Sequence, residues 1–208
     1  MVSFTSMLTT LTGFVLLATS ANAQTCTYVH VVFARGTNQP AGLGKEGQAL
    51  VTGLTSALSS KTTSSYAVNY AASQDQSSAG PGATDMTKHI VSYAASCPNA
   101  VFTSLGSGQV IPTLLASRIK AVVTFGNPLG LFGQTIAQSS TLYGPKSVDD
   151  CNQGDPICGN GNNIAAHLAY VSDGSVAAAA KSTAKLVTST SRNLRGEQQA
   201  VASRMSRH

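Results

Sequence analysis

The chain has 208 residues and a formal net charge of +5, and only 10% of its residues are charged. Four arginines and one glutamate after Leu186 contribute +3 of that charge, so the rest of the chain is close to neutral. Nucleic-acid binding needs lysine and arginine clustered with aromatic side chains on the folded domain, and this pattern is missing. After the first 23 residues, no segment reaches the roughly 18 consecutive apolar residues of a membrane helix, so neither nucleic acid nor membrane is an expected partner.

The first 23 residues are expected to be a signal peptide. An apolar run from Leu8 to Ala18 ends at Ala21-Asn22-Ala23, which has the small-x-small form of a signal-peptidase site. We therefore expect a secreted, extracellular and soluble protein. The 185 residues that remain have the size of one domain, which we assign to residues 24–187. Residues 188–208 are polar and basic without an apolar period, and they predict a disordered tail.

The order of apolar patterns along the chain predicts an α/β fold. Segments 28–34 and 119–125 are rich in β-branched residues and predict strands buried on both faces of a sheet. Apolar residues at helical spacing predict helices over Gly44–Leu58, Thr84–Ala95 and Ser175–Val187. Shorter strands are expected at Ala67–Tyr70, Ala100–Thr103 and Ala166–Val171. This alternation indicates a three-layer sandwich with a central, mostly parallel sheet between helices.

All four cysteines follow the expected signal peptide. An even number of cysteines in an oxidising compartment favours two disulfides over a metal site. We expect Cys26 to pair with Cys97 and Cys151 with Cys158. No metal site is expected, because the cysteine spacings do not match the usual zinc ligand pairs and the histidines are scattered.

An acid and a histidine near the C-terminal end form two thirds of a hydrolase triad. Asp155 lies inside the small ring that a Cys151–Cys158 bridge would close, and His167 follows twelve residues later. In triad chemistry the carboxylate fixes the tautomer of the imidazole and stabilises its protonated form, so the acid must be held still. Folds with this Asp-then-His order place a serine earlier in the chain, on a Gly-x-Ser-x-Gly turn between a strand and a helix. The 208 residues contain no such motif.

Ordinary structural roles compete with these assignments. Asp155 could simply cap a turn, as aspartate commonly does. His30 and His89 are expected on a strand face and a helix face without chemistry. Arg35 is expected to tie loops together by hydrogen bonds.

Four motifs follow one another between about Cys26 and Val187. They are Phe33-Ala34-Arg35-Gly36-Thr37, Cys97-Pro98-Asn99, the segment Val122 to Pro128 and the block Cys151 to Tyr170. Together and in this order they resemble the cutinase family of secreted serine esterases. The resemblance implies a small, lidless α/β-hydrolase that needs no cofactor. It also implies that Asp155 and His167 are the acid and base of the triad and that Thr37 lies at the oxyanion hole. Both expected disulfides match the family.

The resemblance breaks where the nucleophile should be. Cutinases carry Gly-Tyr-Ser-Gln-Gly shortly after the Cys-Pro-Asn motif, whereas residues 100–112 of this chain contain no such pattern. The simplest account is an internal deletion of roughly 20 residues, comprising the nucleophile elbow and one helix. Ser104 and Ser107 are the available stand-ins, but a Gly-Ser-Gly loop at Ser107 lacks the fixed geometry that holds a serine against its base. We therefore expect a fold that lacks one helix, folds weakly and has lost its nucleophile.

By family the expected substrate is an insoluble polyester such as cutin, another plant cell-wall ester or a short acyl ester, hydrolysed by a monomer. Two alternatives remain open. One is a secreted, non-catalytic binding or decoy protein, and the other is an acetylxylan esterase with the same fold and triad, because specificity depends on loops around the cleft.

Overall fold

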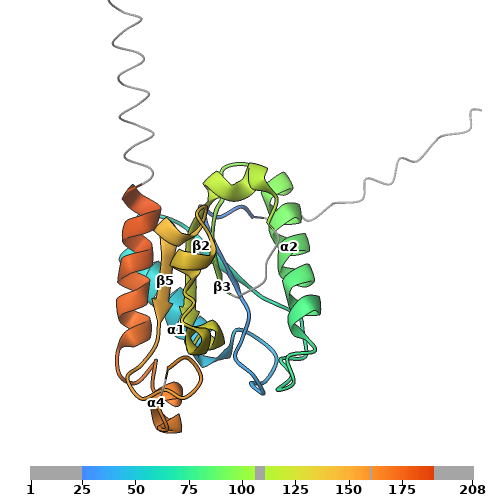
Figure 1. The fold of residues 1–208 in the computed structure, drawn as a ribbon. Helices are drawn as coiled ribbons and strands as arrows, with labels where there is room; N and C mark the ends of the chain where they lie inside the picture. The colour runs from blue at the N-terminus through green and yellow to red at the C-terminus, as the bar shows by residue number, and fades with distance from the viewer. Residues whose placement is uncertain (1–24, 106–110, 160, 190–208) are drawn as a thin grey trace, which may run out of the picture.

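The computed structural model describes residues 25–105, 111–159 and 161–189, and a five-stranded sheet runs through them (Figure 1). The strands have the order β2-β1-β3-β4-β5, and every neighbouring pair is parallel. Their bounds are Val29–Phe33 for β1, Thr63–Ala67 for β2, Val101–Leu105 for β3, Ile119–Phe125 for β4 and Ser147–Asp150 for β5. The expectation of an α/β fold with a parallel central sheet is confirmed.

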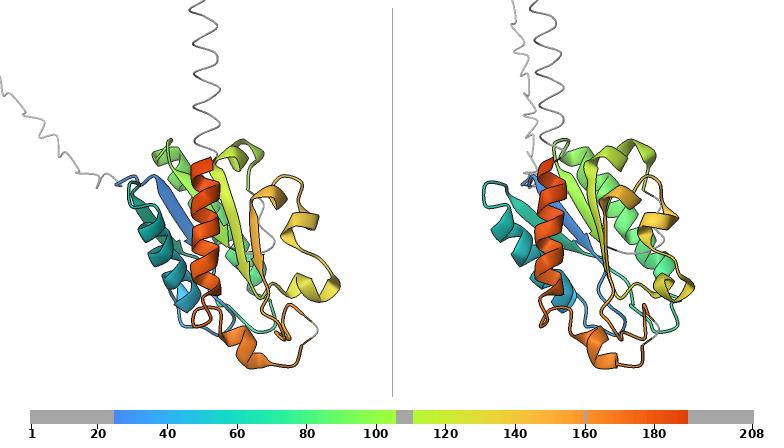
Figure 2. Two further views of the ribbon diagram at one scale, coloured as in Figure 1. Left: turned by 90° about the vertical axis from the view of Figure 1, so that its left-hand side faces the viewer. Right: turned by 60° about the vertical axis from the view of Figure 1, so that its left-hand side comes forward.

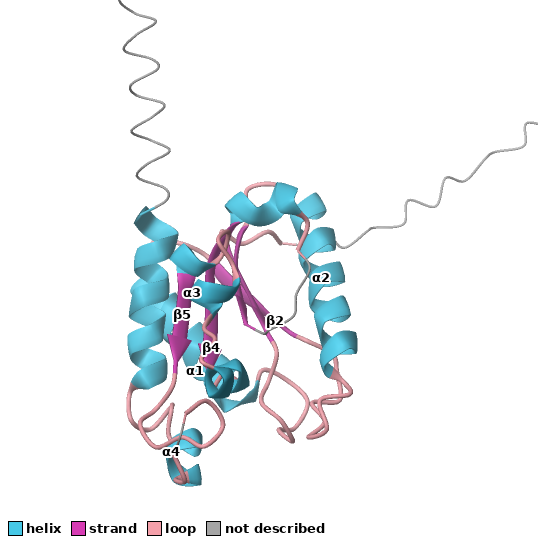
Figure 3. Cartoon of the chain, viewed as in Figure 1, coloured by secondary structure: helices cyan, strands magenta, loops and turns pink. Residues whose placement is uncertain are grey.

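Helices cover both faces of the sheet, which gives the three layers (Figure 3). Helix α1 (Gly44–Ala57) and the helix over residues 175–189 pack on one face, and Figure 2 shows them side by side. They approach closely at Gly53, where an added Cβ would lie 2.7 Å from the Cβ of Ala180. Helix α2 (Ala79–Ser96) covers the other face and packs Met86 and Ile90 against it.

The central strands are buried because both of their faces are covered. All five residues of β1 are buried, and so are the first six of β4. Side chains alternate between faces along a strand, so Val31 contributes to the core under α1 while Val32 contributes to the core under α2. This two-sided burial explains why β1 and β4 have near-continuous apolar sequences.

The expected strand at Ala166–Val171 is wrong. These residues begin inside a short helix, α4 (Ile164–Leu168), and continue into a turn. The side chain of Asn163 accepts a hydrogen bond from the backbone N–H of Ala165 and so caps the first turn of the helix. The edge position next to β4 belongs instead to β5, whose four residues, Ser147 to Asp150, are too polar and too few to stand out in the sequence.

Other boundaries differ from the expected ones by a few residues. Strand β2 lies at Thr63–Ala67 rather than Ala67–Tyr70, and α2 begins at Ala79 rather than Thr84. Pro81 is tolerated there because the first helical turn needs no N–H donor. The C-terminal helix runs through residue 189, so the first two residues of the expected tail are helical. The expected signal peptide and residues 190–208 lie outside the described residues.

Short elements connect the rest of the fold. They are the 3-10 helices η1 (Thr113–Arg118), η2 (Pro128–Phe132) and η3 (Gly144–Lys146) and the helix α3 (Ile136–Ser139). Within the described ranges, no helix combines the length and the apolar character needed to cross a membrane.

Both expected disulfides are present. Cys26 is bonded to Cys97 and ties the start of the described chain to the C-terminal end of α2, while Cys151 is bonded to Cys158 and closes a small loop after β5. The second bridge encloses Asp155.

Candidate functional site

Asp155 is completely buried and fully hydrogen-bonded. One carboxylate oxygen, Oδ1, accepts the backbone N–H of Ile157 at 2.7 Å. The other, Oδ2, accepts from the hydroxyl of Tyr170 at 2.6 Å and faces Nδ1 of His167 at 2.9 Å. Burial raises the pKa of this carboxyl, but the hydrogen bonds from Tyr170, Ile157 and His167 outweigh it and hold the pKa below its ordinary value. Asp155 is therefore a charged, fixed acceptor.

His167 lies at the end of α4 with its Nδ1 toward Asp155 and 30% of its side chain exposed. Since Nδ1 is engaged by the carboxylate, Nε2 is the ring nitrogen that is left for a proton transfer with a ligand. The sequence expectation that Asp155 and His167 meet is matched by this geometry. Tyr170, three residues further on, is a third partner that sequence reasoning missed.

Gly126 has no side chain, and the imidazole of His167 occupies the space that a Cβ would need. The glycine follows β4 with a φ of +64°, and an added Cβ would lie 2.7 Å from Cε1 of His167 and 3.3 Å from Oδ2 of Asp155. A side chain at this position would be strained by its backbone conformation and would displace the histidine. The end of β4 is thus shaped around the Asp155–His167 pair.

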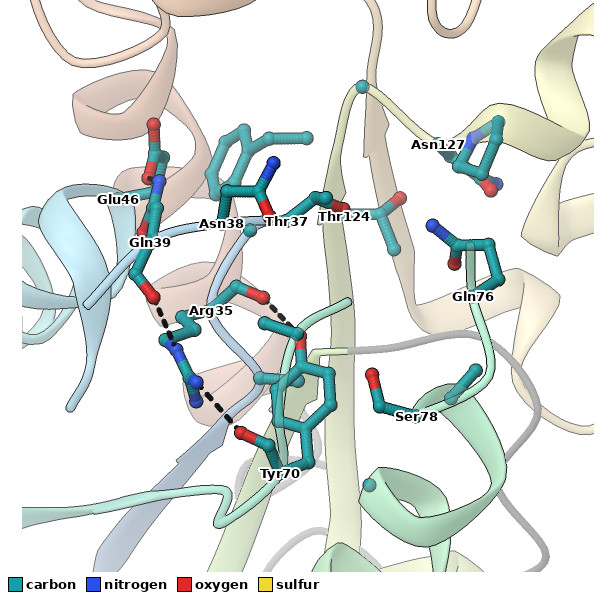
Figure 4. A pocket seen from close by; sticks show the side chains of 18 of the residues that line it. Arg35, Thr37, Asn38, Gln39, Glu46, Tyr70, Gln76, Ser78, Thr124 and Asn127 are labelled. Carbon is teal, nitrogen blue, oxygen red and sulfur yellow. Dashed lines mark hydrogen bonds between the residues drawn. The ribbon is translucent and has the colours of Figure 1, made fainter. Parts of the chain in front are cut away.

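His167 borders a cavity of about 510 Å³ at the carboxyl ends of the strands (Figure 4). The loop after β1 contributes Thr37, the loop after β2 contributes Tyr70, and the loop after β4 contributes Asn127. Thr37 is exposed and lines the same cavity as His167. In parallel α/β sheets ligands bind at this end of the strands, so the cavity is the candidate substrate site.

Arg35 ties two of these loops together, as expected from the sequence. Its Nε donates to the carbonyl of Gln39 at 2.8 Å, and its Nη2 donates to the carbonyl of Tyr70 at 2.7 Å (Figure 4). The hydroxyl of Tyr70 donates in return to the carbonyl of Arg35. The guanidinium is nearly buried, so its charge is stabilised by these carbonyls and by the face of the Tyr70 ring. Its role is to hold the cavity wall.

The two candidate replacement serines are not brought to His167 by the described part of the chain. Ser104 lies inside β3 with no exposed surface, and it does not line the cavity. Its Oγ has no hydrogen-bond partner in the part of the chain that the structure describes. Ser107 lies outside the described residues. Among the described residues, the His167 side chain is hydrogen-bonded to Asp155 and to no serine, although Ser73 and Ser78 line the same cavity.

His30 and His89 form a pair that the sequence did not predict. Their Nε2 atoms are 2.8 Å apart, and Nδ1 of His30 is 2.7 Å from Oγ of Ser64. The ring of His30 stacks on Tyr93 with centroids 3.8 Å apart, and that of His89 stacks on Tyr66 at 3.5 Å. The two histidines do face out from a strand and a helix, but toward each other across the interface between β1 and α2.

A family model and two relatives match most of this chain. The family model described as "Cutinase" matches residues 25–186. A protein named cutinase from Kineococcus radiotolerans is 46% identical over 186 aligned positions, which cover 79% of this chain and 63% of that protein. Carboxylesterase Culp1 of Mycobacterium tuberculosis is 38% identical over 178 positions, covering 77% of this chain and 82% of the relative. The chain thus spans less than two thirds of the length of the Kineococcus protein.

Solved structures agree on the fold. A Trichoderma reesei cutinase in complex with a phosphonate inhibitor has a TM-score of 0.60 and 29% identity, covering 79% of this chain and 77% of that one. An acetyl xylan esterase has a TM-score of 0.65 at 22% identity, covering 77% and 98%, a likeness that shows the fold alone. The architecture is that of the α/β-hydrolase esterases. The chain belongs to the cutinase family, an esterase family of the serine hydrolase type.

Proposed function

We propose that this chain is a secreted carboxylic-ester hydrolase of the cutinase type whose own activity is lost or severely reduced. One observation carries the proposal: a charged, buried Asp155 orients His167 at a cavity, in a chain without a Gly-x-Ser-x-Gly motif. The expected signal peptide at residues 1–23 and the two disulfides support secretion.

The chemistry assigned to the site is acyl transfer through a serine. A serine hydroxyl attacks the ester carbonyl, and Nε2 of His167 takes its proton and passes it to the leaving alcohol. Asp155 keeps the imidazole in the required tautomer and stabilises its protonated form. We assign Thr37 to the oxyanion side of the cavity. The elbow normally supplies the nucleophile and one oxyanion donor together, and loss of the nucleophile alone costs about a factor of 10⁶ in kcat in a serine protease.

The lengths of the alignments support a missing segment. The alignment with the Kineococcus protein has 186 positions but covers 79% of this chain, about 164 of its 208 residues, so about 22 positions are gaps in this chain. That number agrees with the roughly 20 residues of an elbow and one average helix. The gap count supports a deletion rather than a rearranged serine.

Exposed apolar side chains near the cavity favour an insoluble apolar substrate such as cutin polyester. Two of them, Leu131 and Phe132, lie in η2, and two more, Ile164 and Leu168, lie in α4. The same two segments supply Pro128 and His167 to the cavity wall. An apolar rim beside the opening is suited to contact with a polymer surface or short acyl esters.

Two other functions have a supporting observation each. The absence of the motif supports a non-catalytic secreted protein that binds plant cell-wall ester or an inhibitor as a decoy. The polar side chains of Asn38, Gln76 and Ser78 in the cavity wall support acetylxylan esterase specificity, because a small acetyl group needs little apolar contact. Acetate release from xylan compared with hydroxy fatty acid release from cutin separates the two ester substrates.

The test combines fluorophosphonate labelling, tributyrin turnover and a circular-dichroism melt of the purified chain. We expect a melt at low temperature, as the predicted weak folding implies, with no labelled peptide and no turnover above the blank. His167→Ala should then change nothing, and Ser107→Ala should match the exposed control Ser60→Ala.

Each other outcome overturns part of the proposal. Turnover that disappears in His167→Ala would contradict the loss of activity. Labelling at Ser104 or Ser107 would establish a rebuilt nucleophile. A folded chain that adsorbs to cutin without hydrolysing it would replace the enzyme assignment by the decoy function.

A further inference from the structure

Tyr170 shares one oxygen of Asp155 with His167. Its hydroxyl lies 2.6 Å from Oδ2, the same atom that lies 2.9 Å from Nδ1 of His167. Tyr170 is almost completely buried, 1% exposed, and follows α4 by two residues. The shorter of the two contacts therefore belongs to the residue that takes no direct part in the proposed proton transfer.

The direction of the Tyr170 hydrogen bond follows from its other partners. The backbone N–H of Asn152 donates to the Tyr170 hydroxyl oxygen at 3.1 Å, and an N–H can only donate. The sulfur of Cys158, 3.5 Å away, is part of a disulfide and carries no hydrogen. The single phenolic proton is thus directed to the Asp155 carboxylate, and burial together with this hydrogen bond raises the pKa of Tyr170.

The Tyr170 ring packs in the core and also borders the cavity. It belongs to the apolar cluster under α1 and the C-terminal helix, and its ring centroid is 5.6 Å from that of Phe125 in β4. The ring of His167 meets it edge-on with centroids 6.1 Å apart. A hydroxyl on such a platform has little freedom, so it fixes the position of the oxygen to which it donates.

We propose that Tyr170 is a positioning residue, whose hydroxyl holds the Asp155 carboxylate in its charged, oriented form for His167. The proposal rests on the proposed function of the Asp155–His167 pair. Asp155 has no exposed surface, so water cannot replace a lost donor without a local rearrangement. Without the Tyr170 hydroxyl, Oδ2 would keep His167 as its remaining partner, and the two groups would share a less stabilised negative charge.

The experiment removes only the hydroxyl. Tyr170→Phe keeps the ring and its packing, and Tyr143→Phe is the matched control because the buried Tyr143 hydroxyl has no hydrogen-bond partner among the described residues. The carboxyl carbon of Asp155 is followed by ¹³C NMR against pH in the purified chain, using signals of the folded protein. The Nδ1 proton resonance of His167 is recorded in the same samples.

In Tyr170→Phe we expect the Asp155 midpoint to rise by about one pH unit and the Nδ1 proton to move downfield, because fewer donors stabilise the anion. Tyr143→Phe should leave both unchanged. The precision of such a titration is about 0.2 pH units. An Asp155 midpoint within that range of the parent value would overturn the proposal, even if the melting temperature of the variant fell. The reason is that lost packing alone lowers stability without changing the midpoint.

A second variant keeps the test decisive if Tyr170→Phe does not fold. Site-specific 3-fluorotyrosine at position 170 retains the ring and makes the hydroxyl a stronger donor, so the Asp155 midpoint should fall. An unchanged or raised midpoint would contradict the proposal. Neither the Asp155 titration nor the Nδ1 proton signal of His167 requires turnover, so the test also works on an inactive chain. An unchanged Asp155 midpoint would contradict the role of Tyr170 and would leave the esterase assignment standing.

Discussion

The pair formed by buried His30 and half-buried His89 predicts a loss of stability in mild acid. His30 is 3% exposed, and its pKa is lowered to about 4 by burial and by the neighbouring His89. The pKa of His89 is also lowered by burial, which Asp85 partly opposes. The other groups that face His30 are Ser64, Tyr93 and Phe102, and none of them carries a charge that would stabilise an imidazolium.

The direction in which stability changes with pH follows from the proton bound at His30. Between the unfolded pKa of 6.5 and the folded pKa of about 4, the unfolded chain binds a proton at His30 that the folded chain does not. Stability is therefore fully present above pH 6.5 and falls as the pH drops toward 4. The total loss is about 3 kcal/mol, of which about 2 kcal/mol has occurred by pH 5.

The variant that isolates this effect is His30→Phe. Phenylalanine retains the stack on Tyr93 but cannot titrate, and Ser64 keeps a contact of 2.5 Å between its Oγ and Oγ1 of Thr27. Urea unfolding of the disulfide-bonded protein at pH 7.5 and 5 should show the parent losing about 2 kcal/mol more than the variant. Lys88→Gln, an exposed change next to His89, should follow the parent. Equal losses in the parent and in His30→Phe would refute the reasoning.

Three further predictions concern the surroundings of the site and the packing of α2. Gly126→Ala should displace the His167 ring, visible as altered ring signals in NMR, and should cost about 1–2 kcal/mol from the left-handed backbone alone; unchanged ring signals would contradict it. Replacing Cys151 and Cys158 by serine should lower the free energy of unfolding by about 2.5 kcal/mol, measured by urea unfolding. It should also loosen the loop around Asp155, measured by amide exchange of Ile157. Unchanged protection of the Ile157 amide from exchange would count against that role of the bridge. Arg118→Met should lower the free energy of unfolding by about 3 kcal/mol, because the guanidinium donates to the carbonyls of Ala94, Cys97 and Ala100. A thermal melt equal to that of the exposed control Lys88→Gln would contradict this.

The sequence predicted those elements whose apolar pattern follows directly from burial against the core. Strand β4 is predicted residue for residue, because a strand covered on both faces needs a continuous apolar run. Helix α1 is predicted within one residue at its end, because one side faces the core. Strand β5 and α4 were missed because each has only four or five residues, so a pattern cannot decide between strand and helix.

The contact between Asp155 and His167 could be expected from the sequence, whereas their catalytic roles stay a prediction. An aspartate followed by a histidine is the order in which hydrolases of this kind carry a triad acid and base, so the order was informative. The contact of Tyr170 with Asp155 depends on how α4 and the disulfide loop meet in space, and nothing local in the sequence specifies it. The His30–His89 pair likewise requires the register of β1 against α2, which the two separate patterns do not contain.

The Asp155–His167 pair is held by residues far along the chain from the segment where a serine is expected. Asp155 is held by its disulfide loop, by Ile157 and by Tyr170, and His167 follows on α4, all of them later in the chain than β4. In the proposed function the nucleophile would come instead from the turn that normally follows β3 in this fold. The hydrogen bonds of Asp155 and His167 described above involve no residue of β3, so the loss of that turn would leave the Asp155–His167 pair in place. A chain could then keep an oriented histidine after losing the reaction that the proposed function assigns to it.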